Sequence, residues 1–219
     1  MAYNHAGNWP KESPMRLQIL LILLMISLVR PLSAADAPLV RTQALMRTFE
    51  SVQHAQPGQT PSDAVKKANR DVYKQLDAFF DRDALTAEAI APYKAQFAAP
   101  QMAKYVQLFW ELIRLVAYPD ALRGATWTAK AGPAQADQAD VIVHARKEAE
   151  DLETDVTFHW QQSKGQWLVA DVRFDGASLV ADYRNQFGKI LAKDGVAGLL
   201  KKLQSRFDDE RKKRGEAAP

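Results

Sequence analysis

The stretch that most constrains the fold is residues 160–187, WQQSKGQWLVADVRFDGASLVADYRNQF. Two runs rich in β-forming residues flank Ser163-Lys164-Gly165, where the glycine can take the left-handed conformation that a tight hairpin loop needs. Asp175-Gly176 then turns the chain, and Ser178 is placed to cap a helix whose apolar residues recur at helical spacing. The stretch therefore predicts a β-hairpin, a sharp corner and a helix.

The expected register of this hairpin decides which side chains share a face of the sheet. A three-residue loop places Gln162 opposite Gln166, and side chains then alternate between the two faces. One face is apolar and is expected to carry Val156, Phe158, Trp160, Leu168, Ala170, Val172 and Phe174. The other face is half exposed and is expected to carry Thr157, His159, Trp167, Val169, Asp171 and Arg173.

Two earlier segments extend this sheet. Residues 125–130 and 140–147 predict strands joined by a loop, and the second segment alternates cleanly between apolar and polar side chains. Pairing it with residues 154–161 places Val143 opposite Trp160. The apolar face is then continuous across three strands.

Helical spacing of apolar residues predicts the remaining elements. A helix over residues 45–52 is followed by one that begins at Thr60-Pro61-Ser62-Asp63, a proline and N-cap signal. Residues 81–97 are expected to be helical but broken near Pro92, because proline removes a backbone donor. Residues 190–203 are expected to supply closing helices.

The helix expected over residues 102–118 is apolar around most of its circumference. Its polar side chains form one narrow stripe, at Lys104, Gln107, Glu111 and Arg114. Such a helix needs cover on two or three sides. Three alternatives for this cover remain: the sheet, another helix and a bound hydrophobic molecule.

The N-terminal part of the chain has the pattern of an export signal. From Met15, the better start, it has one basic residue, an apolar run over residues 17–29 and small residues up to Ala35 at a cleavage point. The run is short of the roughly 20 residues that a membrane helix needs, so an uncleaved anchor is the alternative. The chain has no cysteine, which excludes disulfides and a lipoprotein anchor.

These features divide the chain into three parts. We expect a leader over residues 1–35, a domain over residues 36–207 and a charged flexible tail over residues 208–219. The whole chain carries a net charge of +3, but without the leader 26 basic residues face 25 acidic ones, a net charge of +1. A nearly neutral domain argues against nucleic acid as a partner.

A longer pattern overlaps the hairpin and its helix. The run W-x3-D-V-x2-D-G-A-S-L-x3-Y-R-x2-F-x2-I-L begins at Trp167 and is followed by Gly195, Gly198-Leu199-Leu200 and Leu203. It resembles the MlaC or toluene-tolerance family of periplasmic lipid carriers. The resemblance extends more weakly upstream and covers most of the mature chain.

The resemblance implies both a fold and a function. The fold is α+β: N-terminal and middle helices pack on one face of a curved antiparallel sheet of about four strands, closed by C-terminal helices, NTF2-like in general shape. The function is to carry phospholipid between an inner-membrane ABC transporter with an MCE-domain ring and an outer-membrane lipoprotein complex, in support of outer-membrane lipid asymmetry. A hopanoid-associated branch of the family is the alternative. No cofactor is implied beyond the lipid cargo.

A lipid carrier needs an apolar slot rather than a catalytic group. Two acyl chains hold about 30 methylenes, and at about 0.8 kcal/mol each their exposure to water costs on the order of 20 kcal/mol. The slot is expected between the apolar face of the sheet and the apolar helix. Its candidate lipid-binding residues are Phe109, Leu112, Ile113, Val116, Val143, Phe158, Trp160, Ala170, Val172 and Phe174.

Two other classes of function are alternatives to the carrier. The sequence contains no Gly-rich phosphate loop, G-x-S-x-G elbow or His-Glu-x-x-His helix, so no catalytic residue is proposed. The expected register puts His144 opposite His159 near Asp155 and Glu148, but no third metal ligand at suitable spacing is visible, and a surface pair is favoured over a metal site. A protein-binding module of the same fold would share every feature except a cavity.

Overall fold

The computed structural model describes residues 36–54, 59–119, 121, 123–163 and 165–214. The leader expected over residues 1–35 lies outside these described residues. Within the described ranges, none of the helices combines the length and the hydropathy that crossing a bilayer requires.

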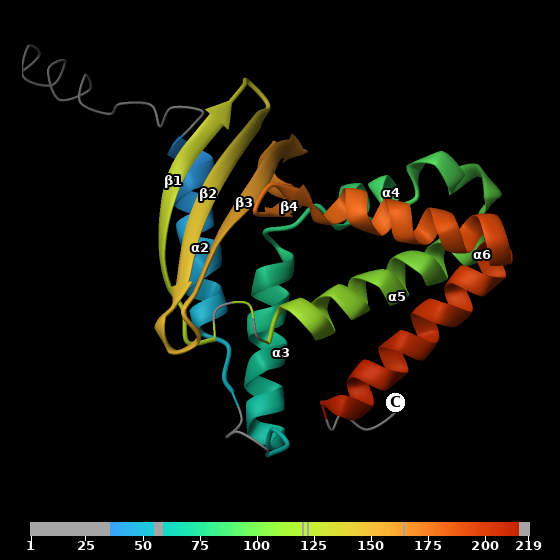
Figure 1. Cartoon of the computed structure of the whole chain (residues 1–219), viewed down its shortest axis with the longest axis horizontal. Coiled ribbons are helices and arrows are strands. Elements are labelled where there is room, and N and C mark those ends of the chain that lie inside the picture. Colours follow the sequence, from blue (N-terminus) through green and yellow to red (C-terminus); the bar gives the residue numbers. More distant parts are fainter. Residues whose placement is uncertain (1–35, 55–58, 120, 122, 164, 215–219) are drawn as a thin grey trace, which may run out of the picture. The chain divides into compact units, whose positions relative to one another are not determined.

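The described chain runs from helices through one antiparallel sheet to a long final helix (Figure 1). The helices are α2 (Asp36–Glu50), α3 (Asp63–Asp77), α4 (Arg82–Glu88), the 3-10 helix η1 (Ala91–Gln96), α5 (Ala99–Ala117), the 3-10 helix η2 (Glu148–Glu150) and α6 (Leu179–Lys213). The strands are β1 (Thr126–Ala134), β2 (Gln138–Lys147), β3 (Leu152–Ser163), β4 (Gln166–Phe174) and β5 (Ala177–Ser178), paired in chain order. The expected α+β class is confirmed, with five strands in place of about four.

Local signals in the sequence account for most helix ends. The side chain of Ser62 accepts a hydrogen bond from the Val65 amide at the start of α3, and Ser178 does the same for the Ala181 amide at the start of α6. The break expected near Pro92 is confirmed, because α4 ends at Glu88 and gives way to η1.

Helix α6 is two helical segments joined at Gly195. That residue has φ 63° and ψ −172°, a conformation that only glycine adopts without strain. The second segment continues to Lys213, so residues 208–213 of the expected tail are helical. Figure 1 shows the two segments of α6 at a sharp angle to each other.

One hydrophobic cluster joins the sheet to α2, while α3 packs on α2. Trp160 is fully buried in it, and its indole N–H donates to the hydroxyl of Thr42 at 2.9 Å. The other buried members of the sheet cluster are Leu45, Met46, Phe49, Val52, Leu76, Tyr118, Ala139, Val141, Val143, Phe158, Trp167, Val169 and Val172.

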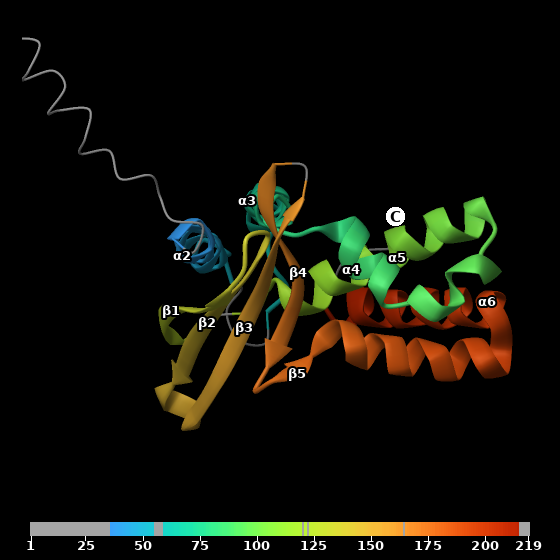
Figure 2. The same cartoon turned by 90° about the horizontal axis from the view of Figure 1, so that it is seen from above.

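A second hydrophobic cluster joins α5 to α6 and η1. Figure 2 shows these helices grouped beside β4 and β5, at the far end of the sheet from β1. The buried members of the helical cluster are Ala89, Ile90, Tyr105, Leu108, Phe109, Leu112, Phe187, Leu191, Leu199 and Leu203. A third, smaller cluster among the described residues consists of Leu85, Trp110 and Val180.

The hairpin register differs from the expected one. Gly165 has the predicted positive φ, 78°, but Ser163 pairs with Gln166, so the loop is one residue shorter than expected. The pairing then shifts by one more residue at Ala170, which forms a β-bulge: Trp160 pairs with Val169, whereas His159 pairs with Asp171.

These two shifts change which β4 side chains face the core. Trp167 and Val169, expected on the half-exposed face, are buried in the sheet cluster, and Leu168 and Ala170 are not part of it. Beyond the bulge the two shifts together move the register by an even number of residues, so Val172 returns to the expected face.

The pairing of β2 with β3 is also displaced along the strands. Val143 pairs with Val156 rather than with Trp160, because η2 makes a tighter turn and both strands run further than expected. The displacement is four residues, an even number, so the faces stay as expected. β1 likewise continues to Ala134, through part of the expected loop.

Candidate functional site

A cavity of about 360 Å³ lies between the sheet and the C-terminal half of α5. One wall consists of side chains of β2, β3 and β4: Val143, Ala145, Lys147, Leu152, Thr154, Val156, Phe158, Val172 and Phe174. The facing wall consists of Trp110, Ile113, Val116 and Ala117 of α5. Residues of α2, α4, α6 and the connections close the sides: Met46, Phe49, Phe80, Leu85, Tyr118, Ala121, Ala125 and Leu179.

Two hydroxyl groups in the cavity lining have partners in the protein. The Tyr118 hydroxyl donates to Asp77 Oδ1 at 3.0 Å, and burial together with the neighbouring Asp77 carboxylate raises the pKa of Tyr118. The Thr154 hydroxyl donates to the carboxylate of Asp175 at 3.3 Å. Lys147 is the charged side chain among the described lining residues. The wall therefore offers a guest almost only apolar contacts.

The cavity changes from buried to exposed along the β2–β3 hairpin. On β2, Val143 is fully buried, whereas the side chain of Lys147, four residues on, is 27% exposed. On β3, Phe158 is buried and Leu152 is exposed. The closed end thus lies toward the middle of the sheet, and the open end lies where β2 turns into β3.

Exposed apolar side chains mark the open side of the cavity. Val116, Leu152 and Phe174 are 36%, 49% and 48% exposed, and all three line the cavity. Large apolar side chains left in water beside an apolar hollow indicate a surface that an apolar partner covers. The arrangement is that of a binding site for a hydrophobic molecule, since ligand pockets typically measure about 300–1,000 Å³.

Comparison with known proteins agrees with this fold. A sequence profile described as MlaC protein matches residues 43–205. The chain belongs to the MlaC family. No curated protein matches it at a significant level. Among solved structures, it resembles the phospholipid-binding protein from Ralstonia solanacearum in complex with a phospholipid, with a TM-score of 0.62, 19% sequence identity and coverage of 81% of this chain and 99% of that chain.

Six of the ten residues predicted from sequence line the cavity of this MlaC-family protein. They are Ile113, Val116, Val143, Phe158, Val172 and Phe174. Phe109 and Leu112 instead lie in the helical cluster between α5 and α6. Trp160 is in the sheet cluster beside Thr42, and Ala170 is the bulge residue.

Sequence reasoning did not assign Trp110, Ala117 and Leu152 to the site. Trp110 and Ala117 precede and follow Ile113 at spacings of three and four residues, so helical periodicity places them on the same side of α5. Leu152 falls outside the predicted site because the sequence predicts a strand only from Thr154, whereas β3 begins at Leu152. No local signal showed that β3 starts two residues earlier.

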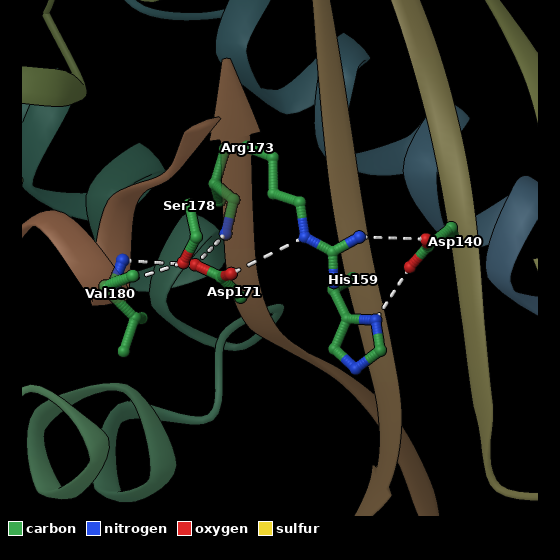
Figure 3. A network of polar contacts seen from close by, with 8 residues as sticks. Asp140, His159, Asp171, Arg173, Ser178 and Val180 are labelled. Atoms are coloured by element: carbon green, nitrogen blue, oxygen red, sulfur yellow. Dashed lines mark hydrogen bonds and ion pairs between the residues drawn. The ribbon is translucent and has the colours of Figure 1, made fainter. Parts of the chain in front are cut away.

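The opposite face of the sheet carries a chain of polar contacts, drawn in Figure 3. Asp140 on β2 accepts a hydrogen bond from Arg173 at 3.1 Å and pairs with His159 at 2.7 Å. Arg173 also pairs with Asp171 at 3.7 Å, and Asp171 accepts from the Val180 amide in the first turn of α6 at 3.2 Å. These contacts fasten β4 and the start of α6 to the middle of the sheet.

The expected pairing of the two histidines is wrong. His144 pairs with Asp155 at 2.9 Å, because β2 and β3 are displaced by four residues relative to the predicted register. Within the described ranges there is no group of three or more His, Cys, Asp or Glu side chains arranged to hold a metal ion.

Proposed function

We propose that this protein is a lipid carrier whose cavity shelters acyl chains from water. The observation that carries the proposal is the apolar cavity between α5 and the sheet, with the exposed Val116, Leu152 and Phe174 at its open side. Membership of the MlaC family supports it, as does the likeness to a structure whose protein is described as phospholipid-binding. A protein-binding module without cargo has no use for such a hollow.

The size of the cavity indicates how much of a lipid it holds. A methylene group needs about as much room as a water molecule in the liquid, roughly 30 Å³, so 360 Å³ accommodates about a dozen such groups. At about 0.8 kcal/mol each, their burial contributes on the order of 10 kcal/mol. One acyl chain fills the cavity, and a second chain enters only when the space between α5 and the sheet widens.

The positions of the helices fit such widening. α5 packs chiefly on α6 and α4, and its side toward the strands is the cavity wall. A carrier gains from this arrangement, because the apolar contacts that hold a tail are not the contacts that hold α5 in place. Burial of a tail then stays comparable to its burial in a membrane, and the cargo remains releasable.

The cellular location and the partners that we propose are those of the MlaC family. We infer that the chain is exported to the periplasm through its leader, binds phospholipid there and passes it between an inner-membrane ABC transporter carrying MCE domains and an outer-membrane lipoprotein complex. The role is binding and transport rather than catalysis, with the lipid as cargo and no other cofactor. A hopanoid is the alternative cargo for the same cavity.

Lipid analysis of the protein purified from its own host tests the proposal. We expect organic solvent to extract phospholipid in a fixed ratio to protein, measured by mass spectrometry. An unrelated exported protein purified by the same steps is the control for carried-over membrane. Hopanoid in place of phospholipid would change the cargo, and the absence of any lipid above the control would contradict the carrier function.

A further inference from the structure

Among the described residues that line the cavity, one side chain is charged, and it lies at the open end. Lys147 is the last residue of β2, pairs with Leu152 across the hairpin, and is the charged side chain among the described lining residues. It shares the cavity face of β2 with Val143 and Ala145, because side chains on one face recur every second residue. A guest that leaves its polar end at the open side of the cavity therefore places it next to an ammonium group.

This ammonium group has an acidic neighbour on η2. The distance from Lys147 Nζ to Glu150 Oε1 is 3.7 Å, an ion pair too long for a hydrogen bond. The side chain of Glu150 is 61% exposed. Both groups can therefore turn toward a ligand: the ammonium offers three donors and the carboxylate only acceptors.

The acids near Lys147 outnumber it. Residues 146–153 read Arg-Lys-Glu-Ala-Glu-Asp-Leu-Glu, two positive charges against four negative ones, and Arg146 pairs with Glu153 at 3.4 Å. A head group with a net negative charge meets attraction from Lys147 and repulsion from the surrounding carboxylates. A head group that carries a phosphate and a cationic amine side by side meets attraction at both ends.

We infer that Lys147 contacts the phosphate of the bound lipid and Glu150 its cationic amine, so that the cavity mouth favours zwitterionic phospholipids over phospholipids of net negative charge. This inference rests on the proposed carrier function. It also sets the orientation of the cargo: the tail runs from the hairpin end toward Phe158, and the head group stays at the turn between β2 and β3.

Competition between two lipids tests the inference. Delipidated protein is incubated with vesicles of equal parts phosphatidylethanolamine and phosphatidylglycerol with identical acyl chains, then separated, and its lipids are quantified by mass spectrometry. We expect the ethanolamine lipid to be enriched by about two- to fivefold, which is the change in affinity that one partly exposed ion pair typically produces. Adding inorganic phosphate in excess should leave the bound lipid unchanged, whereas displacement of lipid would show a site for free anions and overturn the inference.

Charge reversal then assigns the two roles. Glu150→Lys should reverse the preference toward the glycerol lipid, Glu150→Gln should abolish the enrichment, and Lys147→Glu should weaken binding of both lipids. Lys130→Glu, an exposed residue of β1 that does not line the cavity, is the matched control and should behave like wild type.

The outcomes distinguish a failure of this inference from a failure of the proposed carrier function. An unchanged lipid ratio in the Glu150 variants, with normal total lipid and a native circular dichroism spectrum, would overturn the head-group contacts and leave the carrier function standing. Wild-type protein that takes up neither lipid would overturn both.

Discussion

Helix α5 has two apolar sides that face different kinds of interior. Toward α6, the ring centroid of Phe109 lies 4.7 Å from that of Tyr183 and 5.0 Å from that of Phe187, in edge-to-face contact. Toward the sheet, Ile113 and Val116 face an unfilled space of about 360 Å³. The same helix therefore bounds a filled core on one side and a hollow on the other.

The difference follows from the size of the side chains that meet across each side. Aromatic rings from both helices interdigitate between α5 and α6, which is the packing that stabilises a fold. Between α5 and the sheet, the large side chains Trp110, Phe158 and Phe174 line the cavity. Ala117, Ala145 and the valines lie among them, and these small groups do not span the gap. Stability and storage of a guest are thus separated onto two faces of one helix.

The largest expected effect is a loss of stability on the side of α5 that packs against α6. Phe109→Ala should lower the free energy of unfolding by about 3–5 kcal/mol, since it removes a fully buried ring from a packed cluster. Ile113→Ala, on the hollow side of the same helix, should cost about 1–2 kcal/mol, because its side chain already lacks neighbours on one side. Guanidinium unfolding measures both. Equal losses would show that the two sides do not differ.

The second largest effect is a loss of bound lipid from the cavity between α5 and the sheet. Ala145→Trp should reduce bound lipid at least about tenfold, because the indole displaces several methylenes that are each worth about 0.8 kcal/mol. Lipid per protein by mass spectrometry gives the result, and the circular dichroism spectrum should stay native.

Ala170→Trp is the control for this substitution, because Ala170 does not line the cavity and its variant should keep its lipid. The register expected from sequence alone predicts the opposite for Ala170. Lipid lost from the Ala170 variant and kept by the Ala145 variant would contradict the placement of the cavity. Ala117→Trp approaches the same space from α5 and gives an independent test.

The smallest effect concerns the rim of the hollow. Phe174→Ser should change stability by no more than about 0.5 kcal/mol, as exposed substitutions do, and should lower lipid retention about twofold through lost apolar contact at the open side. Val40→Ser is matched to it, since Val40 is 52% exposed on α2 and does not line the cavity. Equal lipid retention in the two variants would remove Phe174 from the site.

Much of the fold was predictable because its signals are local. The N-caps at Ser62 and Ser178, the break near Pro92 and the hairpin glycine Gly165 each act within a few residues, and each was found where expected. The β-bulge at Ala170 was missed although it has a trace in the sequence. Large apolar residues fall at Trp167 and Val169 before it and at Val172 and Phe174 after it, a change of phase in the alternation.

The sequence by itself determined most of the helices, the antiparallel sheet and the apolar faces of β2 and β3, because periodicity records which side of each element is kept from water. It did not determine the apolar face of β4 before the bulge, where Trp167 and Val169 are buried. Only the tertiary structure decided which apolar face meets a partner and which meets a hollow. Phe109 and Ile113 look alike in the sequence, as apolar residues of one helix. Their roles separate because the residues across each come from distant parts of the chain: Tyr183 and Phe187 of α6 meet Phe109, whereas strands of the sheet face Ile113 across the cavity.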